Sequence, residues 1–136
     1  MKSINALLFL LLSVLLSGCK DNEDTNLTLD AESLKQTSWS GTRIQTYNGG
    51  EDIIESSIGI IFYTTKSGEY DIKSESGSDS EYFEYFVEGK MLFIKENVRL
   101  KGYWLVIEKN KNKMVLERST GGDYSYKDTL VLNRSH

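Results

Sequence analysis

The sequence predicts an all-β domain in which eight antiparallel strands follow one another as a meander, close into a barrel and are preceded by one short helix. Three observations support this fold class. Segments rich in aromatic and β-branched residues alternate with turn sequences at the spacing of barrels and sandwiches. No long stretch shows helical periodicity. The 136 residues contain no proline, so every strand interior keeps its backbone donors.

Residues 1–18 are predicted to be a signal peptide that is cleaved. Lys2 supplies a positive charge near the start, and 11 of the 13 residues from Ile4 to Leu16 are apolar. This run is shorter than the roughly 20 apolar residues that span a bilayer, but it has the length of the hydrophobic region of a secretory signal. An ordinary secretory signal followed by an incidental cysteine is the alternative.

The leader ends in Leu16-Ser17-Gly18-Cys19, which resembles the lipobox of bacterial lipoproteins. The resemblance implies that Cys19 takes a diacylglycerol as a thioether and becomes the mature N-terminus. A thiolate is the nucleophile that this chemistry needs. Two or three acyl chains, such as palmitate, hold a protein stably on a membrane, whereas one chain anchors it only marginally. We therefore expect the protein to be anchored in the outer membrane of the cell envelope.

Residues 19–30 are predicted to be a flexible acidic tether, because the chain is charged and has no apolar side chain from Lys20 to Asn26. The segment Lys20-Asp21-Asn22-Glu23-Asp24 is also similar to the signal that sends lipoproteins of the Bacteroidetes group to the cell surface. This similarity implies exposure at the surface, and a simple solvated linker is the alternative.

The folded domain is predicted over residues 31–136 and begins with a helix over Ala31–Gln36. Asp30 is a favourable N-cap, and Glu32 lies in the first turn, where a negative charge suits the helix dipole. Such a short helix is stable only when it packs against other elements. We therefore expect Leu34 to face the barrel.

The strands are placed by turn sequences such as Asn48-Gly49-Gly50, because glycine adopts left-handed conformations without a steric penalty. The second strand is long enough to contain a bulge near Gly59. The polar stretch Ser74–Ser80 is predicted to be a flexible loop. The eight predicted strands are Trp39–Tyr47, Ile53–Thr64, Glu69–Lys73, Glu81–Val87, Lys90–Lys95, Gly102–Glu108, Lys113–Arg118 and Tyr124–Arg134.

The opening Leu34-Lys35-Gln36-Thr37-Ser38-Trp39-Ser40-Gly41 resembles that of lipocalin-like (calycin-type) domains of small bacterial lipoproteins, where a short helix leads to a tryptophan. Three later segments are similar to strands and turns of the same family. These are Ile60-Ile61-Phe62-Tyr63-Thr64-Thr65-Lys66-Ser67-Gly68-Glu69-Tyr70, Tyr85-Phe86-Val87-Glu88-Gly89-Lys90-Met91-Leu92-Phe93-Ile94 and Lys113-Met114-Val115-Leu116-Glu117. The resemblance covers residues 31–135 and implies a lipocalin-like barrel.

The resemblance also implies a structural role for Trp39, which would plug the closed end of the barrel with Arg134 or Arg118 packed on its indole face. Ordinary core packing is the alternative for Trp39. One position departs from the family, because true lipocalins have glycine two residues before this tryptophan, where Thr37 stands. The similarity therefore supports the barrel more than membership of the classical ligand carriers.

Aromatic residues are abundant, with 8 Tyr, 5 Phe and 2 Trp. Two predicted strands, Glu81–Val87 and Gly102–Glu108, carry large apolar groups on both faces. Such residues are ordinary core material, but one face could instead line a cavity and the other meet the helix, a partner or the membrane surface. The candidate ligand-binding residues are the tyrosines that combine an apolar ring with a polar tip: Tyr82, Tyr103, Tyr124 and Tyr126.

Two functions follow as hypotheses. The first is a membrane-anchored lipoprotein whose barrel binds a small apolar or amphipathic ligand, since an eight-stranded barrel has an interior that is either filled or large enough for one small molecule. The second is a non-catalytic interaction module that docks another cell-envelope protein through an outer aromatic face. A contiguous apolar patch on the outside of the barrel would favour the second hypothesis.

Composition argues against several other functions. Removal of Lys2 with the leader leaves 15 basic against 20 acidic residues, and nucleic-acid binding needs clustered cations. The single histidine is His136, and Cys19 is assigned to lipid, so neither a histidine-based triad nor a His/Cys metal site is expected. No nucleophile–base pair or phosphate-binding glycine loop stands out. We expect no cofactor, no metal and no enzymatic activity.

Overall fold

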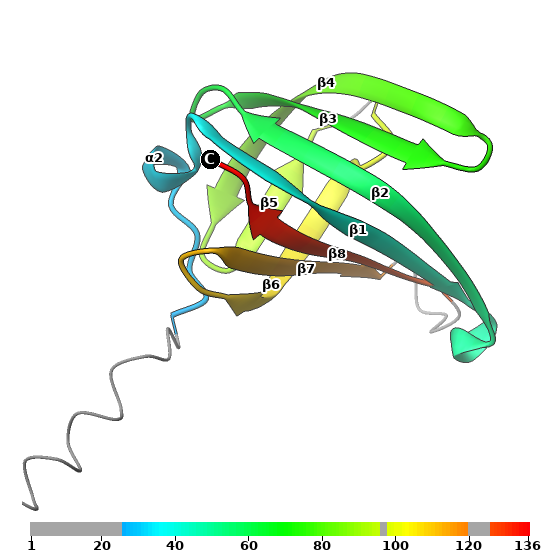
Figure 1. The fold of residues 1–136 in the computed structure, drawn as a ribbon. Coiled ribbons are helices and arrows are strands. Elements are labelled where there is room, and N and C mark those ends of the chain that lie inside the picture. Colours follow the sequence, from blue (N-terminus) through cyan, green and yellow to red (C-terminus); the bar gives the residue numbers. More distant parts are fainter. Residues whose placement is uncertain (1–25, 96–97, 120–125) are drawn as a thin grey trace, which may run out of the picture.

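The computed structural model describes residues 26–95, 98–119 and 126–136. Eight antiparallel strands lie in sequence order around a closed barrel, and β8 pairs back with β1 to complete it (Figure 1). The predicted all-β barrel of eight strands is confirmed. The elements are α2 (Ala31–Leu34), β1 (Thr37–Tyr47), η1 (Asn48–Gly50), β2 (Asp52–Phe62), β3 (Ser67–Ser74), β4 (Gly77–Glu88), β5 (Met91–Ile94), β6 (Gly102–Lys109), β7 (Lys113–Ser119) and β8 (Lys127–Arg134).

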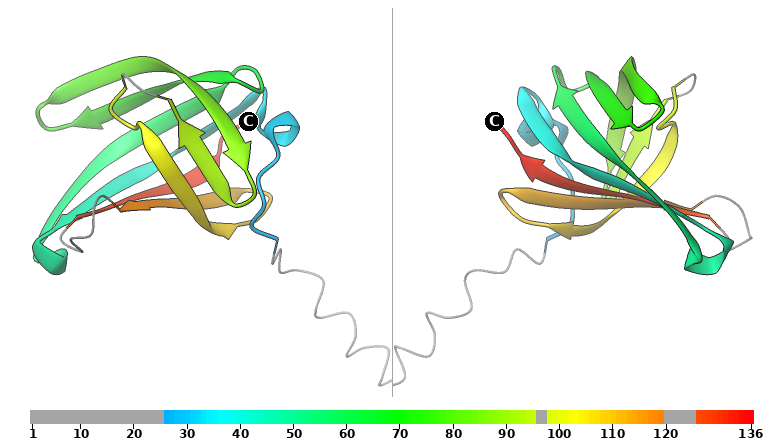
Figure 2. Two further views of the ribbon diagram at one scale, coloured as in Figure 1. Left: turned by 180° about the vertical axis from the view of Figure 1, so that it is seen from behind. Right: turned by 45° about the vertical axis from the view of Figure 1, so that its right-hand side comes forward.

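The β3–β4 hairpin corrects the prediction of a flexible loop over Ser74–Ser80. Residues of this stretch belong to both strands, and the pairing continues to Ser74 and Gly77 at the tip. The polar composition suggested a loop, but an antiparallel ladder is held by backbone hydrogen bonds that do not depend on side-chain polarity. The strand β4 therefore continues well beyond its neighbour β5, which pairs only with residues 85–88 (Figures 1 and 2).

The predicted bulge near Gly59 is also wrong, because β1 and β2 pair without a break from Thr37 and Phe62 to Tyr47 and Asp52. Gly59 is instead required by the side chain of a residue on the neighbouring strand. A Cβ at this position would lie 2.6 Å from an Asp71 side-chain oxygen on β3, so the absence of a side chain makes room for that carboxylate. The irregular pairing lies in β6, between Val106 and Glu108.

The helix α2 begins as the sequence indicated and ends two residues earlier than predicted. The Asp30 carboxylate accepts a hydrogen bond from the backbone N–H of Glu32 at 3.1 Å, which satisfies one of the free donors at the helix start. Gln36 then takes a left-handed conformation with φ of 59° and donates its N–H to the carbonyl of Phe62 at 2.6 Å. This turn ends the helix and directs the chain into β1.

One end of the barrel, the closed end, is packed by the segment before β1. Leu29 and Leu34 are buried in the apolar core, and the N–H of Leu29 donates to the carbonyl of Gly89 in the β4–β5 turn at 2.9 Å. Trp39 is 6% exposed at this end, and its Nε1 donates to the hydroxyl of Thr37 at 2.9 Å. Figure 1 shows α2 beside the C-terminus at the closed end.

Alternate residues of the strands point inward and build the core. The fully buried large side chains from several strands include Trp104, Tyr70, Tyr85, Phe62, Leu92, Leu116 and Leu132. The rings of Phe62 and Tyr85 meet edge to face with centroids 5.1 Å apart, a favourable arrangement for aromatic pairs. The interior is therefore filled by side chains from the closed end as far as Trp104.

The first 25 residues lie outside the described part of the chain, and with them the predicted signal peptide, Cys19 and most of the tether. Among the residues that the structure does describe, no helix has the length and apolarity needed to cross a membrane.

Candidate functional site

The open end of the barrel lies opposite α2, where η1 and the tip of the β3–β4 hairpin project (Figure 1). Ile54 shares the inward parity of Ser56 and Ile58, both of which are buried, yet Ile54 is 51% exposed. Gln45 and Tyr47 share the inward parity of Arg43 and are only partly buried. The inner face of the β1–β2 hairpin is therefore accessible to solvent at this end.

Beneath this accessible face lies a group of charged and polar side chains, the inner cluster, which consists of Arg43, Arg118, Tyr126 and Asp128. Asp128 has no exposed surface and Arg43 is 4% exposed. The two form a bidentate ion pair, with Nε and Nη2 of Arg43 at 3.0 and 2.8 Å from the two carboxylate oxygens. Arg118 Nη2 lies 2.7 Å from Oδ2 of Asp128, and the Tyr126 hydroxyl donates to the same oxygen at 3.0 Å.

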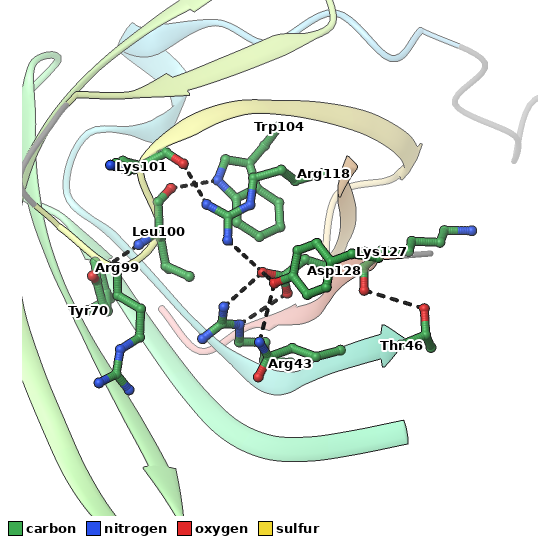
Figure 3. A network of polar contacts seen from close by, with 12 residues as sticks. Arg43, Thr46, Tyr70, Arg99, Leu100, Lys101, Trp104, Arg118, Lys127 and Asp128 are labelled. Carbon is green, nitrogen blue, oxygen red and sulfur yellow. Dashed lines mark hydrogen bonds and ion pairs between the residues drawn. The ribbon is translucent and has the colours of Figure 1, made fainter. Parts of the chain in front are cut away.

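The strand registers explain why these residues meet. Arg118 on β7 stands directly opposite Asp128 on β8, while Asp128 stands opposite Gln45 and therefore diagonal to Arg43 on β1. Side chains alternate between the two faces of a strand, so all of them project to the inside. Figure 3 shows Asp128 between the two guanidinium groups.

The inner cluster carries one net positive charge, since two guanidinium groups share one carboxylate. Burial by itself would lower the pKa of Arg43, but the hydrogen bonds and the charge of Asp128 outweigh burial and hold that pKa above its ordinary value. Arg43 is therefore protonated at any physiological pH, and the positive charge inside the barrel is permanent.

Polar and aromatic side chains connect the inner cluster to the open end. The Nε2 group of Gln45 donates to the hydroxyls of Tyr47 at 3.1 Å and of Tyr126 at 3.2 Å. The rings of Tyr47 and Tyr126 lie with centroids 5.0 Å apart and planes tilted by 44°. Together with Ile54 on the neighbouring strand, these rings offer an apolar surface directly above charged groups.

The segment between β5 and β6 covers another part of the interior. Its described residues, 98–101, form the β5–β6 segment, in which Leu100 is completely buried. Tyr70 and Glu81 hold it from one side, because the N–H of Arg99 donates to Glu81 at 2.9 Å and the N–H of Leu100 donates to the Tyr70 hydroxyl at 3.3 Å. The Tyr70 hydroxyl in turn donates to Glu81.

Burial and the hydrogen bond to Glu81 both raise the pKa of Tyr70, so this hydroxyl keeps its proton. The β5–β6 segment is also held by side chains of β6 and β7. Trp104 Nε1 donates to the carbonyl of Leu100 at 2.8 Å, and Arg118 Nη1 donates to the carbonyl of Lys101. Arg118 thus joins the segment to the inner cluster (Figure 3).

The expected packing of an arginine on Trp39 is corrected by the structure. The guanidinium of Arg118 lies over the ring of Trp104 instead, with Cζ 4.5 Å from the ring centroid. Arg134 is exposed at the closed end, where its Nε donates to the carbonyl of His136 at 3.2 Å. Position along the barrel explains the outcome for Arg118, because Arg118 on β7 is near the open end and Trp39 is at the closed end. Arg134 stands directly opposite Trp39 in the β1–β8 ladder, but its exposed side chain bonds to the carbonyl of His136 and does not pack on the indole.

The four candidate tyrosines take different positions. Tyr126 points into the barrel and belongs to the inner cluster. Tyr82 and Tyr103 are 75% and 56% exposed on the outer face, so they do not line the interior. Tyr82 lines an open surface pocket of about 480 Å³ together with Tyr63 and Lys95. Tyr124 lies outside the described residues.

Part of the outer surface is aromatic. Phe86 on β4, Phe93 on β5 and Tyr103 on β6 face outward side by side, with ring centroids 4.8 Å apart for the first pair and 4.5 Å for the second. Leu105 and Ile107 follow on β6 and are each 43% exposed. These five residues are called the outer aromatic face below. The strands β4 and β6 thus carry large apolar groups on the outer as well as the inner face.

The inner cluster was not predicted from the sequence, although Arg43 has the same parity as Trp39 and so could have been recognised as inward-facing. Asp128 carried no such signal, because nothing local indicates which face of β8 is inside. Across the described ranges, no group of three or more His, Cys, Asp or Glu side chains is placed to hold a metal ion.

No family, curated protein or solved structure was found to match this chain. Functional interpretation therefore rests on the residues of the barrel itself.

Proposed function

We propose that this chain is a lipoprotein with a lipocalin-like barrel that binds a small apolar or amphipathic molecule at its open end. One observation carries the proposal: a solvent-accessible apolar surface at Ile54, Tyr47 and Tyr126 lies directly above buried hydrogen-bonding groups. Small-molecule sites combine an apolar lining with a few convergent polar groups in this way.

The energetics of the inner cluster support the same conclusion. Buried ion pairs lose hydration, and well-packed apolar residues of similar size often stabilise a fold as well or better. The part of the barrel near the closed end is built in that apolar way, whereas the part near the open end contains two arginines and an aspartate. A binding role explains why charged groups are found inside the barrel at its accessible end.

The binding site can be tested with the neutral fluorescent probe N-phenyl-1-naphthylamine. We expect saturable binding to the mature protein, and binding several-fold weaker in Ile54→Ser because this change removes apolar surface at the open end. Ile53→Ser is the matched control, since Ile53 is the adjacent residue on the outer face and is 60% exposed. Absence of saturable binding, or equal effects of the two substitutions, would count against the site.

Native mass spectrometry of protein purified without detergent would show a retained ligand directly.

We also propose that Cys19 carries the lipid that anchors the protein in the outer membrane, with the domain exposed at the cell surface. The lipobox-like sequence Leu16-Ser17-Gly18-Cys19 supports this assignment. Cys19→Ser is expected to leave the protein unprocessed or to release it to the soluble fraction. Ser17→Ala, which keeps a small residue before the cysteine, should fractionate like the wild type. Normal cleavage and unchanged membrane fractionation of Cys19→Ser would refute acylation.

The second candidate function is a non-catalytic module that docks another envelope protein. The outer aromatic face favours it, because adjoining aromatic rings on three neighbouring strands form an apolar patch on the outside of the barrel, as interaction surfaces do. Cross-linking in intact cells should yield an adduct that Phe93→Ser/Tyr103→Ser abolishes and that Ile61→Ser, on an exposed isoleucine of β2, preserves. An adduct unchanged by the double substitution would argue against this face.

A further inference from the structure

The inner cluster has more positive charge and more donors than its single carboxylate can satisfy. Asp128 accepts four hydrogen bonds, two from Arg43 and one each from Arg118 and Tyr126. Four is about the full acceptor capacity of a carboxylate, whereas each guanidinium has five N–H donors. The interior of the barrel is therefore short of acceptors and of negative charge.

Arg118 shows this shortage directly. Its side chain is only 10% exposed, and its Nε is buried without a hydrogen-bond partner. A buried donor without an acceptor is unfavourable, because it has lost its hydrogen bonds to water and gained none in the protein. In native structures such a donor nearly always has a partner, which an ordered water or a bound group supplies where the protein does not.

We infer that the molecule bound at the open end carries a single negative charge, such as a carboxylate or sulfonate group, that faces the inner cluster. This inference rests on the proposed binding function and specifies its ligand class. The anionic group is attracted by the net positive charge of Arg43, Arg118 and Asp128. The apolar remainder of the molecule lies along Ile54 and the rings of Tyr47 and Tyr126.

The buried position of the inner cluster strengthens its attraction for an anionic group. Attraction between charges in a poorly hydrated interior is several-fold stronger than in water. The acidic residues nearest the open end on β2, Asp52 and Glu55, are exposed, and exposed charges are screened by salt. The positive charge of the inner cluster therefore dominates at the floor of the site.

Two probes with the same aromatic skeleton test the inference. The anion 8-anilinonaphthalene-1-sulfonate differs from neutral N-phenyl-1-naphthylamine by its sulfonate. Gln45→Glu adds a negative charge next to the inner cluster with little change of shape. We expect this variant to weaken binding of the anionic probe about tenfold more than binding of the neutral probe. The neutral probe reports any change caused by loss of the hydrogen bonds from Gln45 to Tyr47 and Tyr126. Thr46→Glu, the matched control, adds the same charge on the opposite face of β1 and should change neither affinity.

The outcomes separate the inference from the proposed function. Failure of both probes to bind the wild type overturns the binding function itself. Binding of the neutral probe that depends on Ile54, together with anionic-probe affinity unaffected by Gln45→Glu, overturns the charge inference alone. If Gln45→Glu fails to fold, Arg43→Gln replaces it, with exposed Arg134→Gln at the closed end as its control. Equal loss of anionic-probe affinity in these two arginine variants also contradicts the inference.

Discussion

Asp128 is the residue on which the charged interior depends. It is fully buried and bridges two guanidinium groups that reach it from β1 and β7. Its removal would leave Arg43 and Arg118 in the interior with no negative charge beside them. Loss of one partner from a buried ion pair is far more damaging than loss of an exposed pair, because the remaining charge is not hydrated.

We therefore expect Asp128→Ala to lower the free energy of unfolding by about 3–5 kcal/mol. Asp79→Ala is the matched control, because Asp79 pairs with Arg99 at 2.6 Å while both side chains are about half exposed, at 50% and 53%. Exposed pairs contribute ~0–1 kcal/mol. Urea unfolding at neutral pH measures both changes. Similar losses in the two variants would show that Asp128 does not hold an essential buried pair.

At the scale of elements, the β5–β6 segment is the part of the barrel most dependent on side-chain hydrogen bonds. Four side chains from four strands hold its backbone: Tyr70 on β3, Glu81 on β4, Trp104 on β6 and Arg118 on β7. None of these contacts belongs to the ladder of the sheet. A change in any one of the four side chains therefore acts on this segment without removing a strand pairing.

Glu81 makes this anchoring sensitive to pH. The backbone N–H of Arg99 and the Tyr70 hydroxyl hold the pKa of Glu81 below its ordinary value of 4.5. A carboxylate whose pKa is lower in the folded state than in the unfolded state stabilises the fold. This stabilisation is fully present above the unfolded-state pKa and is lost as the pH falls through the folded-state pKa. The contribution of Glu81 is thus complete at pH 7 and disappears in acid.

Glu81→Gln should accordingly reduce the free energy of unfolding at pH 7, and its difference from wild type should shrink as the pH is lowered below 4.5. Urea unfolding of both proteins across this pH range is the measurement. Glu84→Gln provides the control, because Glu84 lies on the same strand but faces outward and is exposed. A difference that stays constant with pH would contradict the role of the Glu81 charge.

The elements also show where sequence reasoning succeeds. The strands flanking Asn48–Gly50 are nearly as predicted, because hairpin turns need glycine in left-handed conformations and Gly49 and Gly50 have φ of 68° and 97°. The β3–β4 hairpin was missed, because polar residues at its tip do not reveal a backbone ladder. The orientations of Tyr82 and Tyr103 could not be predicted, because strands with large groups on both faces do not indicate which face is inside.

At the scale of the whole molecule, the barrel has two unlike ends. The closed end is packed with apolar side chains and covered by the segment that includes Leu29 and Leu34. The open end holds the inner cluster and an accessible inner face. The strand β1 passes through both regions and is paired on both sides along most of its length, with β2 and with β8.

We expect amide hydrogen exchange to divide β1 into two parts. Residues 37–41 should exchange more slowly than residues 43–47, because local opening of the apolar end exposes more buried surface. Exchange measured by NMR compares the two parts within a single strand and the same ladder, which provides an internal control. Equal protection along β1 would indicate that the barrel opens as one unit and that the two ends do not differ in local stability.

The sequence by itself determined the number and order of the strands, the turns that connect most of them and the start of α2, because these depend on local preferences of neighbouring residues. Only the tertiary structure decided which face of each strand is inside, which tryptophan receives Arg118 and how Arg43 meets Asp128, 85 residues away. The physical reason is barrel closure. Alternation along a strand assigns residues to two faces, but the pairing of β1 with β8 determines which face becomes the interior.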